Sequence, residues 1–348
     1  MPLEANSDPR QPVRVVDPAA GVEPVEQAGR LRAEGAAAVL VQAAAGGSDD
    51  PTLHWLDSSH ARGWVRSAAP TNADTLERAW EAQRGQGHVA ADALLLAFGA
   101  LPLLSWGEAP PEPLRPPTAE GAPLGIYAIV DSALRVRQVL EAGVRTVQLR
   151  LKRPADADAR WQAVLAAAVR ESVAAARDHG ARLFINDHWR LAAELGATAV
   201  HLGQEDLLAL GETGRAELRA CGLALGISSH AVWELCRARA LAPAYVACGP
   251  VWPTTTKDMP WRPQGLDNLA WWARVAGTPV VAIGGILDAA QVREAARAGA
   301  DGVCVLRGLG DDPMRVVPAL QKAFERGRSE RAAASAPALP HPTLEPQP

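Results

Sequence analysis

The 348-residue sequence has no excess of positive charge, no long apolar run and few cysteines. A formal net charge of −4 argues against bulk nucleic-acid binding, which needs a dense basic surface. The longest apolar stretch, residues 93–106, is too short to span a membrane and is interrupted by Gly99 and Pro102. Residues 1–17 carry charge and proline where a signal peptide needs an apolar run, so we expect no export signal.

The four cysteines of the chain are Cys221, Cys236, Cys248 and Cys304. Each lies in an apolar part of the sequence, and their spacing is not that of a zinc site. We therefore expect reduced thiols in the core rather than disulfides. Together with the missing export signal and membrane span, this predicts a cytoplasmic protein that has neither nucleic acid nor a membrane as its partner.

A proline-rich segment divides the chain into two parts of different character. Residues 108–123, with the sequence EAPPEPLRPPTAEGAP, have the composition of a semi-rigid linker. Residues 1–107 form a smaller N-terminal segment, and residues 124–328 form the larger domain. The tail, residues 329–348, is rich in alanine, proline and serine and is predicted to be disordered.

Short apolar runs that are typical of buried strands alternate with longer amphipathic runs throughout the larger domain. The strand-like runs are GIYAIV, TVQLRL, RLFIND, TAVHLGQ, ALGIS, AYVACGPVW, PVVAIGGI and DGVCVL. Eight strand–helix units in about 205 residues is the count of a TIM barrel, (β/α)8. Continuous apolar strands are also what a parallel sheet covered on both faces requires. We therefore predict an α/β protein whose main domain is a TIM barrel, preceded by a smaller α/β segment.

A basic stripe follows the second predicted strand. Gln148, Arg150 and Lys152 alternate along this strand, so their amide, guanidinium and ammonium groups project to the same side. Such barrels carry their chemistry at the carboxyl ends of the strands. The stripe is costly in a core unless an acidic group lies opposite, so an ion pair inside the barrel is the alternative to an anion-binding site.

Two aspartates follow the third and fourth predicted strands. Asp187 comes directly after Asn186 at the end of the third strand, and Asp206 lies shortly after the fourth. Because neighbouring strand ends lie side by side, the two carboxylates can share one cation and leave room for water and phosphate, as Mg²⁺ prefers. Helix N-capping is the alternative, since aspartate favours that position. Two aspartates beside a basic stripe favour a Mg²⁺ site.

The remaining strand ends add hydroxyl groups, an ammonium group and glycines. The fifth strand ends in residues 228–230, Ser-Ser-His, and the sixth leads into three threonines and a lysine, residues 254–257. Gly284 and Gly285 end the seventh strand, where missing side chains let backbone N–H groups approach a ligand. The eighth strand ends at residues 306–308, where this fold commonly holds phosphate.

The rim therefore offers places for two anions, one of them bound to the metal. The sequence shows no activated Ser–His–Asp arrangement and no thiolate environment, so covalent catalysis is not expected. His201 and His230 are interpreted as hydrogen-bonded structural histidines rather than as catalytic bases.

At these residues the barrel resembles the thiamine-phosphate synthase family. The matching strings are GVRTVQLRLK, FINDHWRLA, AVHLGQEDL, LGISSH, GPVWPTTTKDMP followed by PQGL, VAIGGI and AGADGVCV, in the family's order across residues 125–309. The resemblance implies a transferase that joins 4-amino-2-methyl-5-hydroxymethylpyrimidine diphosphate to 4-methyl-5-(2-phosphoethyl)thiazole or its carboxylated form. Thiamine phosphate and pyrophosphate would be the products of a Mg²⁺-assisted, dissociative displacement.

The resemblance also implies a role for each rim residue. The pyrimidine diphosphate would be held by Gln148, Arg150, Lys152, Asn186, Ser228 and Lys257. Mg²⁺ would bind Asp187 and Asp206. The thiazole phosphate would be held by Thr254, Thr256, Gly285, Leu306 and Arg307. The groups expected to act directly in catalysis, by stabilising the departing pyrophosphate, are Arg150, Lys152, Ser228 and Lys257.

Two positions depart from the family pattern. Arg307 stands where the family commonly has a small hydroxyl residue, and it would either strengthen phosphate binding or obstruct it. Ser229 stands in the place of a threonine. A non-catalytic barrel that binds thiamine intermediates as a regulator, or a thiazole tautomerase-like barrel, are the alternative functions. Neither alternative function requires the complete set of residues that would bind the diphosphate and the metal.

Residues 1–107 faintly resemble the C-terminal part of a hydroxymethylpyrimidine phosphate kinase. The glycine-rich anion hole of that kinase, GTGC, has no counterpart between Pro70 and Gly87. We therefore interpret the segment as a degenerate, non-catalytic remnant that packs on the barrel or helps it to associate. Assembly into a homo-oligomer stays open.

Overall fold

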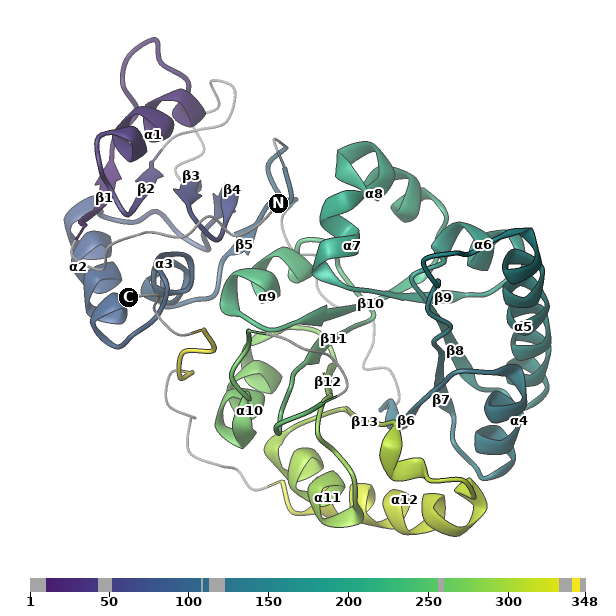
Figure 1. Cartoon of the computed structure of the whole chain (residues 1–348). Coiled ribbons are helices and arrows are strands. Elements are labelled where there is room, and N and C mark those ends of the chain that lie inside the picture. Colours follow the sequence, from purple (N-terminus) through teal and green to yellow (C-terminus); the bar gives the residue numbers. More distant parts are fainter. Residues whose placement is uncertain are drawn as a thin grey trace.

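The computed structural model describes residues 11–42, 52–107, 109–112, 123–255, 260–331 and 340–344. These residues form two units that pack against each other (Figure 1). The larger unit is a closed barrel of eight strands, and the smaller N-terminal unit contains a five-stranded sheet. The predicted TIM barrel with a smaller N-terminal α/β segment is confirmed.

Every strand of the barrel is parallel to its neighbours, and helices surround the barrel on the outside. The strands are β6 (Gly125–Val130), β7 (Thr146–Leu149), β8 (Arg182–Asn186), β9 (Ala199–Leu202), β10 (Ala224–Ser229), β11 (Tyr245–Cys248), β12 (Val280–Ala282) and β13 (Gly302–Val305). The helices are α4 (Ala133–Glu141), α5 (Ala159–Asp178), α6 (Trp189–Glu194), α7 (Gln204–Ala209), α8 (Gly211–Ala220), α9 (Val232–Arg239), α10 (Gly265–Val275), α11 (Ala289–Ala298), η2 (Arg307–Leu309) and α12 (Pro313–Ser329).

Alternation along each strand divides the apolar side chains between two cores. On β6, Tyr127 and Ile129 belong to a cluster inside the barrel, where they meet Phe184 and Tyr245. The alternate residues of β6, namely Ile126, Ala128 and Val130, belong to the larger core beneath the helices. Because both faces of the sheet are covered, the strands are mostly apolar, and the polar residues buried within them, such as Gln148 and His201, need hydrogen-bond partners inside the barrel.

The N-terminal unit is a mixed sheet with helices on both faces. Its strands are β1 (Val13–Val16), β2 (Ala38–Val41), β3 (Leu53–Ser58), β4 (Arg62–Arg66) and β5 (Leu103–Leu104), and its helices are α1 (Pro24–Ala33), α2 (Ala73–Gly85) and α3 (Ala90–Ala97). Only β1 and β2 run parallel, and the other neighbours are antiparallel. The likeness of this unit to a kinase stays a prediction.

The structure describes residues 340–344 within the tail that the sequence predicts to be disordered. Asn268 on α10 exchanges two hydrogen bonds with the backbone of His341, at 2.9 and 3.1 Å. The backbone oxygen of Thr343 accepts a hydrogen bond from the Arg262 N–H at 2.9 Å. These contacts satisfy backbone groups that a disordered segment leaves to water. This short segment is therefore ordered against α10.

Three of the four cysteines lie in the core, as the sequence predicts. All four are free thiols, and Cys236, Cys248 and Cys304 are buried. Cys221 is exposed, which corrects the prediction that it lies in the core. It directly follows α8, at the C-cap of that helix, where the chain turns toward β10 at the surface.

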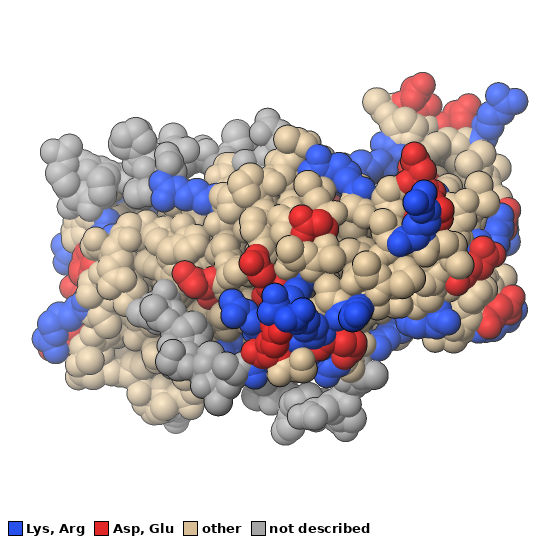
Figure 2. Space-filling model, turned by 90° about the horizontal axis from the view of Figure 1, so that it is seen from below, with Lys and Arg blue, Asp and Glu red and all other residues tan. Residues whose placement is uncertain are grey.

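Acidic and basic side chains lie side by side on the face that carries α11 and α12 (Figure 2). Glu330 forms ion pairs there with Arg293 at 2.7 Å and with Arg326 at 2.9 Å. Pairing of this kind agrees with the nearly balanced net charge of the chain. Among the helices that the structure describes, none is long and apolar enough to cross a membrane.

Candidate active site

A cavity of about 520 Å³ opens at the carboxyl ends of the barrel strands. Its wall contains every predicted site residue that the structure describes, namely Gln148, Arg150, Lys152, Asn186, Asp187, Asp206, Ser228, Thr254, Gly285, Leu306 and Arg307. Two further predicted residues, Thr256 and Lys257, lie outside the described residues. Strand ends that are distant in the sequence therefore meet around one space, while the individual roles of these residues stay predictions.

The basic stripe runs from the barrel interior to the mouth of the cavity. Gln148 is 2% exposed, and its Nε2 donates a hydrogen bond to Tyr127 Oη at 3.1 Å. The backbone N–H of Arg150 donates to Val130 O at 2.7 Å, which extends the β6–β7 pairing to the rim. Within the described ranges, no carboxylate pairs with Arg150 or Lys152 inside 4.0 Å, so the alternative of a barrel-interior ion pair is not supported there.

Asp206 lies close enough to Asp187 for its charge to act on the Asp187 carboxyl group. Burial raises the pKa of Asp187, and the charge of Asp206 raises it further, while His188, Arg150 and Lys152 lower it. Repulsion between two carboxylates at one site is relieved when a cation binds between them. The pair therefore fits a hard divalent cation such as Mg²⁺.

Helix capping, the alternative reading of the aspartates, applies to one of them. Asp206 Oδ2 accepts a hydrogen bond from the Gly203 N–H at 2.9 Å at the start of α7. Asp187 precedes α6, but the N-cap of that helix is His188, which makes no side-chain capping bond. Instead, Asp187 has a left-handed backbone with φ of 63°. Capping explains part of the role of Asp206 and none of that of Asp187.

No group of three or more His, Cys, Asp or Glu side chains that could hold a metal occurs in the described part of the chain. A pair of carboxylates is nevertheless a usual number of protein ligands for Mg²⁺, which keeps several waters and takes others from substrate phosphates. The donor set thus fits a metal that binds together with a diphosphate and does not fit a closed structural metal centre.

A chain of buried hydrogen bonds crosses the barrel beneath the cavity. It runs from Gln148 to Tyr127 Oη, on to Tyr245 Oη at 2.7 Å, to His201 Nδ1 at 2.6 Å, and from His201 Nε2 to Ser228 Oγ at 2.8 Å. An amide nitrogen only donates, so Gln148 donates to Tyr127. The Tyr127 O–H can then donate to Tyr245, and the Tyr245 O–H to His201 Nδ1, which gives both hydroxyl hydrogens an acceptor. In that direction His201 donates to Ser228, whose own O–H is left to donate into the cavity.

His201 takes part in this series of hydrogen bonds as a neutral imidazole. Burial lowers its pKa to about 3, and the nearby Arg150 charge lowers it as well. A neutral imidazole with a partner on each nitrogen agrees with the interpretation of His201 as a structural histidine. The tyrosines are the part that sequence reasoning missed. The available signal was a hydroxyl group at an inward-facing strand position, which needs a buried partner.

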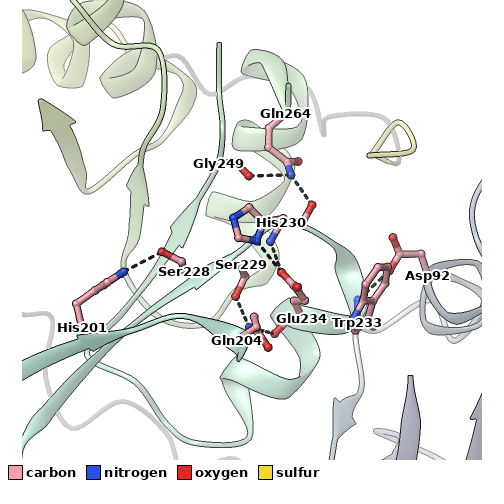
Figure 3. Close-up of polar contacts among 10 residues, drawn as sticks. All are labelled: Asp92, His201, Gln204, Ser228, Ser229, His230, Trp233, Glu234, Gly249 and Gln264. Carbon is pink, nitrogen blue, oxygen red and sulfur yellow. Dashed lines mark hydrogen bonds and ion pairs between the residues drawn. The ribbon is translucent and has the colours of Figure 1, made fainter. Parts of the chain in front are cut away.

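His230 and the residues next to it are held from several sides (Figure 3). Glu234 Oε2 accepts hydrogen bonds from the His230 backbone N–H at 2.6 Å and from its ring Nδ1 at 3.0 Å. Gln264 Nε2 donates to the His230 backbone oxygen at 2.6 Å. Gln204 Nε2 donates to Ser229 Oγ at 2.8 Å, and that hydroxyl is fully buried. These hydrogen bonds agree with the interpretation of His230 as a structural histidine, although His230 lines the cavity. Ser228 lines the cavity too, and Ser229 does not.

The glycines after β12 are required by the neighbouring loop. Gly285 has φ of 74°, and a Cβ placed there would lie 2.6 Å from Trp252 Cβ and 2.7 Å from Pro253 O. The loops after β11 and β12 therefore touch through their backbones. Across the mouth, Arg307 Nη1 donates to Thr255 Oγ1 at 3.1 Å. Gly285 thus lies in close contact with the loop after β11, in addition to its predicted contact with a ligand.

Comparison with known proteins identifies the family. The model of the family described as thiamine monophosphate synthase matches residues 126–309, more than half of the chain. The chain belongs to the thiamine monophosphate synthase family. The match begins at β6 and ends at η2, so the N-terminal unit lies outside it.

Several members of the family are similar to this chain. A thiamine-phosphate synthase of Neisseria meningitidis serogroup A is 44% identical over 207 residues, which cover 59% of this chain and 96% of the relative. A thiamine-phosphate synthase of Escherichia coli O6:H1 is 47% identical over 180 residues, covering 51% and 77%. The solved thiamine phosphate pyrophosphorylase of Pyrococcus furiosus is 28% identical, with a TM-score of 0.50, and the match covers 59% and 96%.

We expect Gly285→Ala to destabilise the protein more than a glycine replacement that adds strain alone. Left-handed strain costs about 1–2 kcal/mol, and pressing Cβ into the loop after β11 adds about 1–3 kcal/mol. Gly277→Ala is the matched control, since Gly277 has φ of 66° with nothing within 4 Å of the added Cβ. Urea denaturation measures both. Equal losses would show that the contact between the two loops is unimportant.

Proposed function

We propose that the barrel is a Mg²⁺-dependent thiamine-phosphate synthase. It joins the methylene carbon of hydroxymethylpyrimidine diphosphate to the nitrogen of a thiazole phosphate and releases pyrophosphate. The observation that carries this proposal is that a single cavity, in a chain of this family, is lined by the carboxylates of Asp187 and Asp206 and by the cations of Arg150 and Lys152. Membership of the family makes the chain a transferase.

The diphosphate would lie between these two sets of groups. Asp187 and Asp206 would hold Mg²⁺, which supplies positive charge to the oxygens of the leaving group. Arg150 and Lys152 donate charge-assisted hydrogen bonds to the remaining oxygens. Ser228 adds a neutral donor, because its hydroxyl is turned toward the cavity by His201. Lys257 would add a further cation. All of these donors stabilise charge that grows as the pyrophosphate departs.

The thiazole phosphate would lie on the opposite side of the cavity. Gly285 and the turn of Leu306 and Arg307, which line the cavity, would offer backbone N–H groups to the phosphate, and Thr254 would offer a hydroxyl. The cavity is also lined by the apolar side chains of Ile129 and Ile283. These side chains exclude water, which would otherwise compete with the thiazole nitrogen as the nucleophile.

The reaction needs no protein base. The C–O bond to the diphosphate breaks with its electron pair on the leaving oxygen, and the lone pair of the thiazole nitrogen forms the new C–N bond. No proton moves in either event. This agrees with the low pKa of His201, which is neutral and engaged at both nitrogens, and with catalysis by positioning and charge stabilisation.

The test is an assay of the purified full chain with both substrates. We expect thiamine phosphate and pyrophosphate to appear together when Mg²⁺ is present, to stop when EDTA removes the metal, and to return when Mg²⁺ is restored. Liquid chromatography measures the first product, and a coupled phosphate assay measures the second. Binding without turnover would indicate the regulator, and conversion of thiazole without the pyrimidine would indicate the tautomerase; either result would overturn the proposal.

A further inference from the structure

We propose that the N-terminal unit is a working part of this active site, and that Asp92 is the positioning residue through which it acts. The carboxylate of Asp92 caps barrel helix α9, and α9 in turn holds the His230 loop at the cavity wall. The proposal deepens the proposed function and rests on it, although its structural part can be measured independently.

Asp92 caps a helix that has no cap of its own. The residue before α9 is Ala231, whose side chain accepts no hydrogen bond, so the first N–H groups of this helix need acceptors from elsewhere. Asp92, on α3 of the N-terminal unit, accepts a hydrogen bond from the Trp233 N–H with Oδ1 at 2.8 Å (Figure 3). The two residues are 141 positions apart in the sequence.

The carboxylate of Asp92 is deeply buried, with 3% of the residue exposed. Burial raises its pKa to about 7, and the nearby Glu234 charge raises it too, whereas hydrogen bonds from the backbone of Trp233 and Val232 lower it. A buried carboxylate is costly unless its acceptor capacity is used. Asp92 uses its acceptor capacity for backbone N–H groups at the N-terminus of α9.

The first turn of α9 is connected directly to the cavity wall. Glu234 lies in that turn and accepts both hydrogen bonds from His230, through the backbone N–H and through ring Nδ1. His230 lines the cavity two residues after Ser228. A shift of the first turn therefore moves Glu234, the backbone of His230 and, through the short connection, the hydroxyl of Ser228.

A series of aromatic ring contacts makes a second connection between the N-terminal unit and the cavity wall. His60 of the N-terminal unit lies 5.4 Å from the ring of Trp233, and Trp233 lies 5.5 Å from Trp261. Trp261 stacks on His230 at 5.3 Å with an interplanar angle of 10°. This series of ring contacts begins in the N-terminal unit and ends at the cavity wall, as the hydrogen-bonded connection does.

The rest of α9 is fastened to the N-terminal unit along its length. Trp106 Nε1 donates to Arg237 O at 2.7 Å, and Arg237 Nη2 donates to Arg62 O at 3.0 Å. Arg239 Nη1 donates to Leu101 O at 2.8 Å. In an isolated barrel the outer face of a helix meets water. Here that face is buried, so the N-terminal unit determines where α9 lies.

The decisive variant is Asp92→Ala in the full chain, with Asp92→Asn as its rescue. Alanine leaves the Trp233 N–H without its acceptor, while asparagine keeps an acceptor oxygen at the same place. For Asp92→Ala we expect KM for the pyrimidine diphosphate to rise about fivefold to tenfold, the size of a lost helix cap. KM for the thiazole phosphate should change less than about twofold, and Asp92→Asn should restore both values to within about twofold.

The matched control is Asn72→Ala, which removes an N-cap in the same unit but away from α9. Asn72 accepts a hydrogen bond from the Thr75 N–H at 3.1 Å at the start of α2. We expect this variant to lower Tm as Asp92→Ala does, with both KM values unchanged. If Asp92→Ala also lowers Tm and leaves both KM values unchanged, Asp92 serves packing alone and the proposal is overturned.

Amide hydrogen exchange separates this proposal from the proposed function. In Asp92→Ala, exchange should accelerate at least about tenfold across residues 228–235, and Asn72→Ala should leave that segment protected. If the wild-type chain forms no thiamine phosphate but the two variants show this difference in exchange, the proposed function fails and the connection between Asp92 and the cavity wall stands. Unchanged exchange in Asp92→Ala would remove the connection. If Asp92→Ala does not fold, His60→Ala, which removes the ring contact with Trp233, should show the same change at smaller amplitude, and its absence would contradict the proposal.

Discussion

Replacing Asp187 with asparagine should lower kcat/KM for thiamine phosphate formation by a factor on the order of 10²–10³. The substitution removes one of two carboxylates that face the expected Mg²⁺, and the metal is the largest positive charge available to the leaving pyrophosphate. Steady-state kinetics at several Mg²⁺ concentrations measure the loss. Part of it should be recovered at high Mg²⁺, because Asp206 remains.

Asparagine is chosen here because of the backbone of Asp187. This residue has φ of 63°, a left-handed conformation that asparagine and aspartate tolerate better than alanine. Burial and Asp206 raise the pKa of Asp187, so ionising this carboxyl group is less favourable in the folded than in the unfolded chain, and a neutral amide removes that cost. Tm should therefore not fall. Asp178→Asn, an exposed change at the last residue of α5, is the control; full activity in Asp187→Asn would refute the metal assignment.

Replacing Arg150 with alanine should weaken binding of the pyrimidine diphosphate far more than that of the thiazole phosphate. A charge-assisted hydrogen bond contributes about 1.5–3 kcal/mol, which corresponds to a factor of about 10–10² in affinity. Calorimetric titration of each substrate separately measures this difference. The thiazole phosphate should lose less than about threefold, because its predicted phosphate site is formed by the loops after β11, β12 and β13.

Two further variants give this experiment its controls. Arg150→Lys keeps the positive charge but loses the planar fork of donors, so it should restore only part of the affinity. Arg137→Ala removes an exposed arginine of α4 whose partner is Glu171, and it should change neither affinity. Equal losses for both substrates in Arg150→Ala would show that the division of the cavity into two phosphate sites is mistaken.

The barrel and most of its rim could be predicted from the sequence. Period-two alternation predicts that Gln148 on β7, and Arg150 and Lys152 just beyond its end, project to one side, and all three line the cavity. The carboxyl ends of parallel strands also meet at one edge of the sheet. Asp187 and Asp206 therefore meet without any knowledge of side-chain packing. The local sequence pattern is sufficient to predict these rim residues, because all strands of a parallel barrel end at the same rim.

Hydrogen bonds between side chains could not be predicted in this way. The contact between Tyr127 and Tyr245 joins residues 118 positions apart, and Tyr245 has room for its ring only because position 226 is glycine. At Gly226 an added Cβ would lie 2.3 Å from the Tyr245 ring. No periodicity records which inward-facing side chain meets which, because that depends on how the barrel closes.

Residues 11–112, where described, show the same division most clearly. Their sequence indicates strands and helices, yet nothing local shows that Asp92 accepts a hydrogen bond from the Trp233 N–H. By itself the sequence determined the barrel, the order of its strands and the residues at their ends, because these follow from short-range alternation of apolar and polar side chains. Only the tertiary structure decided the polarity of the hydrogen bonds beneath Ser228 and the docking of the N-terminal unit on α9, because both depend on long-range contacts that form when the two units pack.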